Sequence, residues 1–73
     1  MFRVSIRSSK DPLQYKTVGD FKTIKEAKTG CRNVVKTLTA CEFFEIYEDG
    51  IPIIVTDPSF HRTVRGLHFV RIG

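Results

Sequence analysis

Two cysteines and two histidines are the side chains of this 73-residue chain best suited to hold a metal ion. Nine residues separate Cys31 from Cys41, and six separate His61 from His68. Zinc fingers and ribbons instead pair their ligands about two to five residues apart, so this spacing does not favour zinc. We therefore expect no metal site, and no motif in the chain indicates a cofactor.

Nucleophilic catalysis is the other chemistry that a cysteine could support. A reactive thiol needs a partly exposed, electropositive setting that stabilises the thiolate. Cys31 falls among the apolar positions of a predicted helix, where a small core residue is the expected role, and Cys41 has no base near it in the sequence. Neither cysteine predicts a catalytic centre.

Carboxylates gather between residues 42 and 49, but their arrangement indicates structure rather than catalysis. They follow a predicted strand into its turn: Glu42, Glu45, Glu48 and Asp49. General acid–base catalysis needs carboxyl groups that converge on a substrate across a cleft, and this run predicts a solvated or ion-paired strand. The chain also lacks a glycine-rich phosphate loop, so we expect it not to be an enzyme.

A stripe of basic residues is the strongest functional pattern in the chain. At about 100° per residue, one side of a predicted helix collects Lys25, Lys28, Arg32 and Lys36. Like charges four residues apart repel by a few tenths of a kcal/mol, whereas the helix dipole favours cations near a C-terminus. The stripe is thus either a solvated helix face or a surface for nucleic acid or another acidic partner, which Arg62 and Arg65 would extend.

Charge is also segregated along the chain, whose formal net charge is +4. Residues 1–36 carry nine basic and three acidic side chains, residues 37–60 carry five acids and no Lys or Arg, and residues 61–73 carry three arginines. Such asymmetry favours an acidic partner such as nucleic acid. Internal pairing of acidic strands with basic elements is the alternative interpretation.

The helix that must position the basic stripe is predicted from residue 23 to about residue 39. Thr23 and Glu26 form a capping-box pair at its start. An inward apolar stripe follows at helical spacing: Ile24, Ala27, Cys31, Val34, Val35 and Leu38. Gly30 interrupts the helix at a cost of about 1 kcal/mol relative to Ala.

Two strands are predicted before the helix. Phe2, Val4 and Ile6 alternate with polar residues, which is typical of a half-buried strand. Residues 8–12 have turn chemistry, and residues 13–18 form a weaker second strand that pairs with the first. Gly19 and Asp20 are expected to end this second strand.

A second hairpin is predicted within residues 41–57. Asp49-Gly50 between apolar runs favours a two-residue type I′ turn, which places Ile46 opposite Ile53. This register gives one face to the core and puts aromatic and apolar residues on the outer face: Phe43, Tyr47, Pro52 and Ile54. Pro52 marks the second strand of the hairpin as an edge of the sheet, at least at that point.

The outer face supplies an alternative functional surface. Phe43, Tyr47, Pro52 and Ile54 would form an interface for another protein, as in a small inhibitor, an accessory protein or a homodimer. Base stacking on the aromatic residues is a further interpretation, since Arg3 and Arg7 of the first strand belong to the same face. A loop covering this face, such as residues 57–66, would remove both.

Residues 57–66 are expected to form a loop or a short helical turn, and residues 67–72 a last strand in the centre of the sheet. The fold class is therefore α+β: a single domain over residues 1–73 with an antiparallel sheet of four or five strands and one helix on one face, in the order β-β-α-β-β-β. A ferredoxin-like βαββαβ arrangement is the alternative.

The remaining expectations concern location and role. No apolar run reaches the roughly 18 residues of a membrane span, and the first ten residues lack the apolar stretch of a signal peptide. Two cysteines do not predict a disulfide framework. The sequence thus predicts a cytoplasmic, non-enzymatic binding module with no membrane partner and no evident small-molecule substrate.

Overall fold

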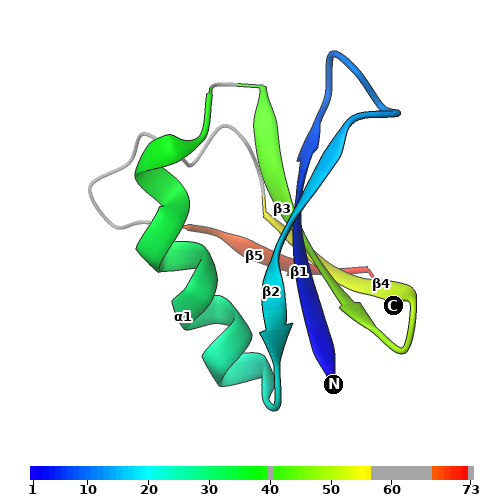
Figure 1. The fold of residues 1–73 in the computed structure, drawn as a ribbon, viewed down its shortest axis with the longest axis vertical. Helices are drawn as coiled ribbons and strands as arrows, with labels where there is room; N and C mark the ends of the chain where they lie inside the picture. The colour runs from blue at the N-terminus through cyan, green and yellow to red at the C-terminus, as the bar shows by residue number, and fades with distance from the viewer. Residues whose placement is uncertain (40, 57–66, 73) are drawn as a thin grey trace.

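The computed structural model describes residues 1–39, 41–56 and 67–72, which form one antiparallel sheet with a helix packed on it. The elements are β1 (Phe2–Ser8), β2 (Tyr15–Phe21), α1 (Ile24–Val34), the 3₁₀ turn η1 (Val35–Thr37), β3 (Glu42–Glu48), β4 (Ile51–Thr56) and β5 (Phe69–Arg71). The strand order across the sheet is β2-β1-β3-β4-β5. These elements confirm the predicted α+β fold and its order along the chain (Figure 1).

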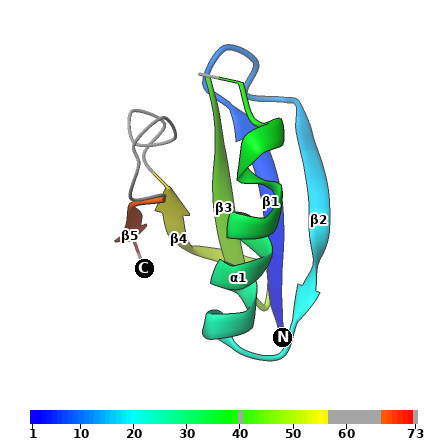
Figure 2. The ribbon, with the colours of Figure 1, turned by 90° about the vertical axis from the view of Figure 1, so that its left-hand side faces the viewer.

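Two strands precede α1, whereas the ferredoxin-like alternative has one, so that alternative is wrong. The helix contacts β1 and β2, and it connects β2 at one edge of the sheet to β3 on the far side of β1. β4 and β5 extend past one side of the helix (Figure 2). The helix therefore divides the molecule into a covered face of the sheet and an open outer face.

The second strand begins later than the sequence predicts. The turn after β1 is closed by Asp11, whose carboxylate accepts a hydrogen bond from the Leu13 N–H at 3.2 Å and whose carbonyl accepts one from the Gln14 N–H at 3.1 Å. These bonds hold Leu13 in the turn, where it is 90% exposed. Gly19 and Asp20, predicted to end the strand, lie inside it instead.

The start of the helix is as predicted, and its end is earlier. The Thr23 hydroxyl accepts a hydrogen bond from the Glu26 N–H at 3.1 Å, which confirms the N-cap. α1 ends at Val34, whose φ of −117° leaves the helical region, and η1 adds one tighter turn before Leu38. Ala27 and Cys31 are fully buried, and the other members of the predicted apolar stripe pack against the same core.

Gly30 has a packing role, although glycine is unfavourable in the middle of a helix. It is buried where α1 crosses the end of β2, and a Cβ atom built on it would lie 2.5 Å from Cζ of the Phe21 ring. No side chain larger than hydrogen fits there unless the ring moves. The glycine therefore lets the helix approach the sheet closely.

The β3–β4 hairpin turns as predicted but shifts its register further from the turn. Asp49 and Gly50 both have positive φ, of 50° and 83°, in agreement with the type I′ turn. Beyond the Tyr47–Pro52 pair, Ile46 pairs with Ile54 instead of Ile53, because an extra residue enters β4.

This bulge turns both Ile53 and Ile54 into the core, with exposed fractions of 7% and 5%. The predicted outward position of Ile54 is therefore wrong. Farther along the hairpin, the buried Thr56 hydroxyl accepts a hydrogen bond from the Phe44 N–H at 2.9 Å, so a side chain satisfies this backbone donor.

β5 is the edge of the described sheet and not its centre. It pairs with β4 through Ile54–Arg71, Val55–Val70 and Thr56–Phe69, which places β4 between two neighbours. The edge predicted at Pro52 is local: Pro52 precedes the residues of β4 that pair with β5, and the rest of β4 lies inside the described sheet. Apolar residues on both sides of β5 suggested a central strand, but Val70 and Ile72 are exposed.

Candidate functional site

Of the predicted basic residues, Lys25, Lys28 and Arg32 lie on α1 and Lys36 lies on η1. We call these four residues the basic helix face. Lys25, Arg32 and Lys36 are exposed, and Lys28 is half-buried. None of the four forms an ion pair with any residue in the described parts of the chain. The acid in the same helix, Glu26, lies in its first turn.

The middle of the basic helix face is anchored on an aromatic ring from β5. The Lys28 ammonium lies 5.2 Å and the Arg32 guanidinium 5.5 Å from the centre of the Phe69 ring. A cation over a ring face is stabilised by about 0.5–2 kcal/mol, depending on how much water is removed. Phe69 itself packs against the hydrophobic core, so the two cations are held where β5 meets the helix.

Phe69 is a site residue that the sequence did not predict. Its position beside Lys28 and Arg32 depends on the pairing of β5 with β4, a contact between segments far apart in the chain. Arg71 lies two residues farther along β5 and therefore on the same face of that strand. Arg62 and Arg65, predicted to extend the surface, lie outside the described residues.

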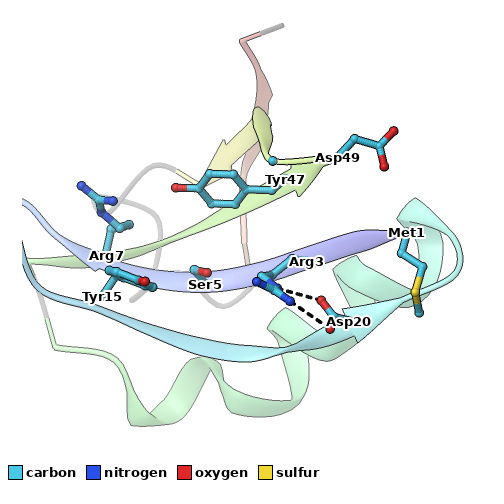
Figure 3. A pocket seen from close by; sticks show the side chains of 9 residues that line it. Met1, Arg3, Ser5, Arg7, Tyr15, Asp20, Tyr47 and Asp49 are labelled. Carbon is cyan, nitrogen blue, oxygen red and sulfur yellow. Dashed lines mark hydrogen bonds and ion pairs between the residues drawn. The ribbon is translucent and has the colours of Figure 1, made fainter.

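The outer face of the sheet contains two arginines, and each has a carboxylate partner. Arg3 binds Asp20 through Nε at 2.9 Å and Nη2 at 3.4 Å, in an exposed pair that joins β1 to β2 (Figure 3). The hydrogen bond from Arg3 lowers the pKa of the Asp20 carboxyl. Both partners are exposed, so this pair adds little to stability.

Arg7 is held from three directions on the same face. Its Nε lies 3.4 Å from the Glu45 carboxylate, its Nη2 donates to the Pro12 carbonyl at 2.6 Å, and its guanidinium lies 6.0 Å from the centre of the Tyr15 ring. Tyr47 donates its hydroxyl to the same Glu45 oxygen at 2.8 Å. Burial and this bond to Glu45 raise the pKa of Tyr47.

The predicted protein interface on this outer face is reduced by the register of β4. Ile54 is buried in the core and does not belong to the outer face, while Phe43, Tyr47 and Pro52 are half-buried. The side chains of Arg7 and Glu45 lie among them, because Phe43 pairs with Arg7. What remains is a mixed polar and aromatic surface in place of a contiguous apolar patch.

The two cysteines are free, and their surroundings differ. Cys31 is buried on the inward side of α1 as predicted, and burial raises the pKa of its thiol to about 12, which keeps it protonated at neutral pH. Cys41 is half-buried. No three His, Cys, Asp or Glu side chains gather as metal ligands in the described residues, and His61 lies outside them.

Comparison with known proteins adds no family to these observations. The chain matches no protein-family model, and neither curated proteins nor solved structures show a significant similarity to it. Across residues 1–39, 41–56 and 67–72, no helix is long and apolar enough to cross a membrane.

Proposed function

We propose that this protein is a non-enzymatic module that binds nucleic acid through its basic helix face. The observation that supports this most is a contrast in pairing. Arg3 and Arg7 on the outer face each have a carboxylate partner, whereas Lys25, Lys28, Arg32 and Lys36 have none among the described residues. Four neighbouring cations without a carboxylate partner among the described residues favour an external anion.

The spacing of the cations favours a partner with repeating charge. Lys25, Lys28 and Arg32 are three and four residues apart on α1, which corresponds to about 4.5–6 Å along the helix axis, and Lys36 follows in η1. A nucleic acid backbone presents a phosphate at regular short intervals along each strand. Contacts of this kind are not specific for sequence, so the proposed binding is governed by the phosphates.

Phe69 supports the proposal by reducing the disorder of the cations. Long basic side chains lose rotamer entropy when they are immobilised by a ligand. Because Lys28 and Arg32 already lie over the Phe69 ring, part of that loss occurs during folding. Arg32 also suits a phosphate partner, because its guanidinium can bind two phosphate oxygens at once, whereas the ammonium of Lys25 acts as a point charge.

A salt titration tests the proposal. Fluorescence anisotropy with a labelled duplex and its single strand would give affinities between about 50 and 200 mM salt. Four phosphate contacts predict a log–log slope of about −3.6 on the duplex and about −2.8 on the single strand. On the duplex this corresponds to a roughly 150-fold loss of affinity over that range.

A matched pair of variants locates the contacts. Lys25→Gln with Lys36→Gln removes two exposed cations of the face and is expected to bring the duplex slope to about −1.8. Lys10→Gln with Lys16→Gln removes the same charge elsewhere and is expected to leave the slope unchanged. Absence of binding at low salt, equal effects of the two pairs, or equally tight binding to poly-glutamate would each contradict the proposal.

A further inference from the structure

A hollow on the outer face of the sheet has the features of a second binding site, separate from the basic helix face. Its volume is about 590 Å³, and residues from β1, β2 and β3 line it, including Arg3, Ser5, Arg7, Tyr15 and Tyr47 (Figure 3). Small-molecule sites have volumes of about 300–1,000 Å³. The hollow lies on the face of β1 opposite the buried Val4, away from α1.

Ser5 points to an occupant of this hollow. It is only 3% exposed, yet its hydroxyl makes no hydrogen bond to any side chain or backbone group of the described residues. A buried hydroxyl without a partner costs about 1–3 kcal/mol, which a water molecule or a ligand in the hollow would recover. The sheet thus holds a polar group in place for something outside the chain.

The charges around the hollow exclude a simple anion. Arg3 is bound to Asp20 and Arg7 to Glu45, and the Asp49 carboxylate also lines the hollow. No excess of positive charge therefore remains to bind a phosphate, in contrast to the basic helix face. Each guanidinium carries five N–H donors, so both arginines keep free donors next to carboxylate acceptors.

Two tyrosines supply the apolar part of the hollow. Tyr15 is 62% exposed, and its ring is held by the Arg7 guanidinium. Tyr47 projects from β3 at the other side of the hollow, with its hydroxyl fixed by Glu45 (Figure 3). The rings offer flat surfaces to a ligand whose edges meet donors and acceptors together.

We propose that this hollow binds a neutral saccharide. A sugar hydroxyl both donates and accepts hydrogen bonds, which matches the mixture of guanidinium, carboxylate and Ser5 hydroxyl groups. The C–H face of a sugar ring is apolar and complements an aromatic ring. A phosphate does not fit the balanced charge of the hollow, and a fully apolar ligand would leave the Ser5 hydroxyl and the guanidinium donors without hydrogen-bond partners.

An NMR titration of the full chain tests this inference. The probes are maltotriose, cellotriose and N,N′,N″-triacetylchitotriose as neutral saccharides, with inorganic phosphate and adenosine as comparisons. At least one saccharide is expected to shift the backbone amides of Ser5, Tyr15 and Tyr47 in a saturable manner, while phosphate shifts none of them. No shift with any of the three saccharides, or an equal response to phosphate or adenosine, would overturn the inference.

Variants separate binding from folding. Ser5→Ala loses no hydrogen bond within the described chain and is expected to weaken saccharide binding roughly three- to tenfold. Tyr15→Ala removes an exposed ring and is expected to reduce saturable binding below detection. Leu13→Ala, outside the hollow, is expected to leave binding unchanged, as is Lys25→Gln with Lys36→Gln. Ser5→Ala binding as well as the parent protein would count against the assigned role of the hydroxyl.

Discussion

The basic residues on the two faces of this molecule have different partners. On the outer face of the sheet, Arg3 and Arg7 are each bound by a carboxylate from a neighbouring strand. On the basic helix face, four cations have no acidic partner in the described residues, and two of them lie over an aromatic ring instead. The presence of basic side chains alone does not distinguish these faces, since both contain them, whereas carboxylate pairing does.

Strand pairing explains the difference. In an antiparallel sheet, directly opposite residues hold their side chains close together, so Arg3 meets Asp20. Arg7 is opposite Phe43 and reaches Glu45 diagonally, two residues farther along β3. A helix at the surface has no such neighbour on its solvent side, and its charges are balanced only by residues of the same helix. Charge pairing is thus a consequence of strand register on the outer face, and the basic helix face has no equivalent pairing within the described residues.

Charge reversal is expected to have the largest effect on this contrast. Lys25→Glu with Lys36→Glu should weaken nucleic acid binding roughly 100-fold at low salt, because two phosphate contacts become two repulsions. Arg3→Glu with Lys10→Glu makes the same change in net charge outside the basic helix face and should weaken binding less than about threefold. Anisotropy with one labelled duplex measures both, and similar losses would mean that only net charge matters.

Local patterns predicted most of the elements correctly. The Thr23 cap, the apolar stripe from Ile24 to Leu38 and the Asp49-Gly50 turn depend on residues near in sequence, and all three are confirmed. β2 was placed two residues early because Leu13 continues an apolar pattern that the hydrogen bonds of Asp11 interrupt. The composition of 13–18 contains no signal for that turn closure.

Features that depend on distant segments could not be predicted. The bulge that buries Ile54 and the edge position of β5 follow from packing of β4 against the core, which hydrophobic alternation alone does not determine. The position of Phe69 beneath Lys28 and Arg32 also depends on the pairing of β5 with β4 and could not be predicted from the sequence. Arg3 and Arg7 were assigned to the outer face correctly, but their carboxylate partners required the strand register.

Gly30→Ala tests whether the helix is held at its distance from the sheet by Phe21. In a solvent-exposed helix this change would stabilise by about 1 kcal/mol. Here the new Cβ would meet the Phe21 ring, and overpacking typically costs about 1–3 kcal/mol, so we expect a net destabilisation of about 1 kcal/mol. Urea unfolding measures it, with the exposed Asn33→Ala as a control expected to be neutral or stabilising. A Gly30→Ala protein more stable than the parent would show that the Phe21 ring moves aside to accommodate the new Cβ atom.

Phe69→Leu removes the ring beneath Lys28 and Arg32 while keeping an apolar side chain in the core. We expect affinity for nucleic acid to fall about threefold, because the two cations lose a contact of about 0.5–1 kcal/mol that orders them. The salt slope should stay the same, since the number of phosphate contacts does not change. Val70→Leu, on the exposed side of the same strand, is the matched control. A changed slope would mean that Phe69 determines which cations reach the phosphates.

Removing the Arg3 guanidinium is expected to have the smallest effect, and it tests the pairing on the outer face directly. The pKa of Asp20 is lowered mainly by its hydrogen bond from Arg3, so Arg3→Gln should raise that pKa toward the ordinary value of a free Asp. A lowered carboxyl pKa adds stability above the unfolded-state pKa, and that contribution disappears as the pH falls through the folded-state pKa. The parent protein should therefore lose a small increment of stability on acidification that Arg3→Gln lacks.

A carboxyl-carbon NMR titration of Asp20 measures the pKa, with Lys36→Gln as a control that should not move it. An unchanged Asp20 pKa in Arg3→Gln would mean that this pair does not persist in solution, and the contrast between the two faces would then lose one of its two neutralised arginines.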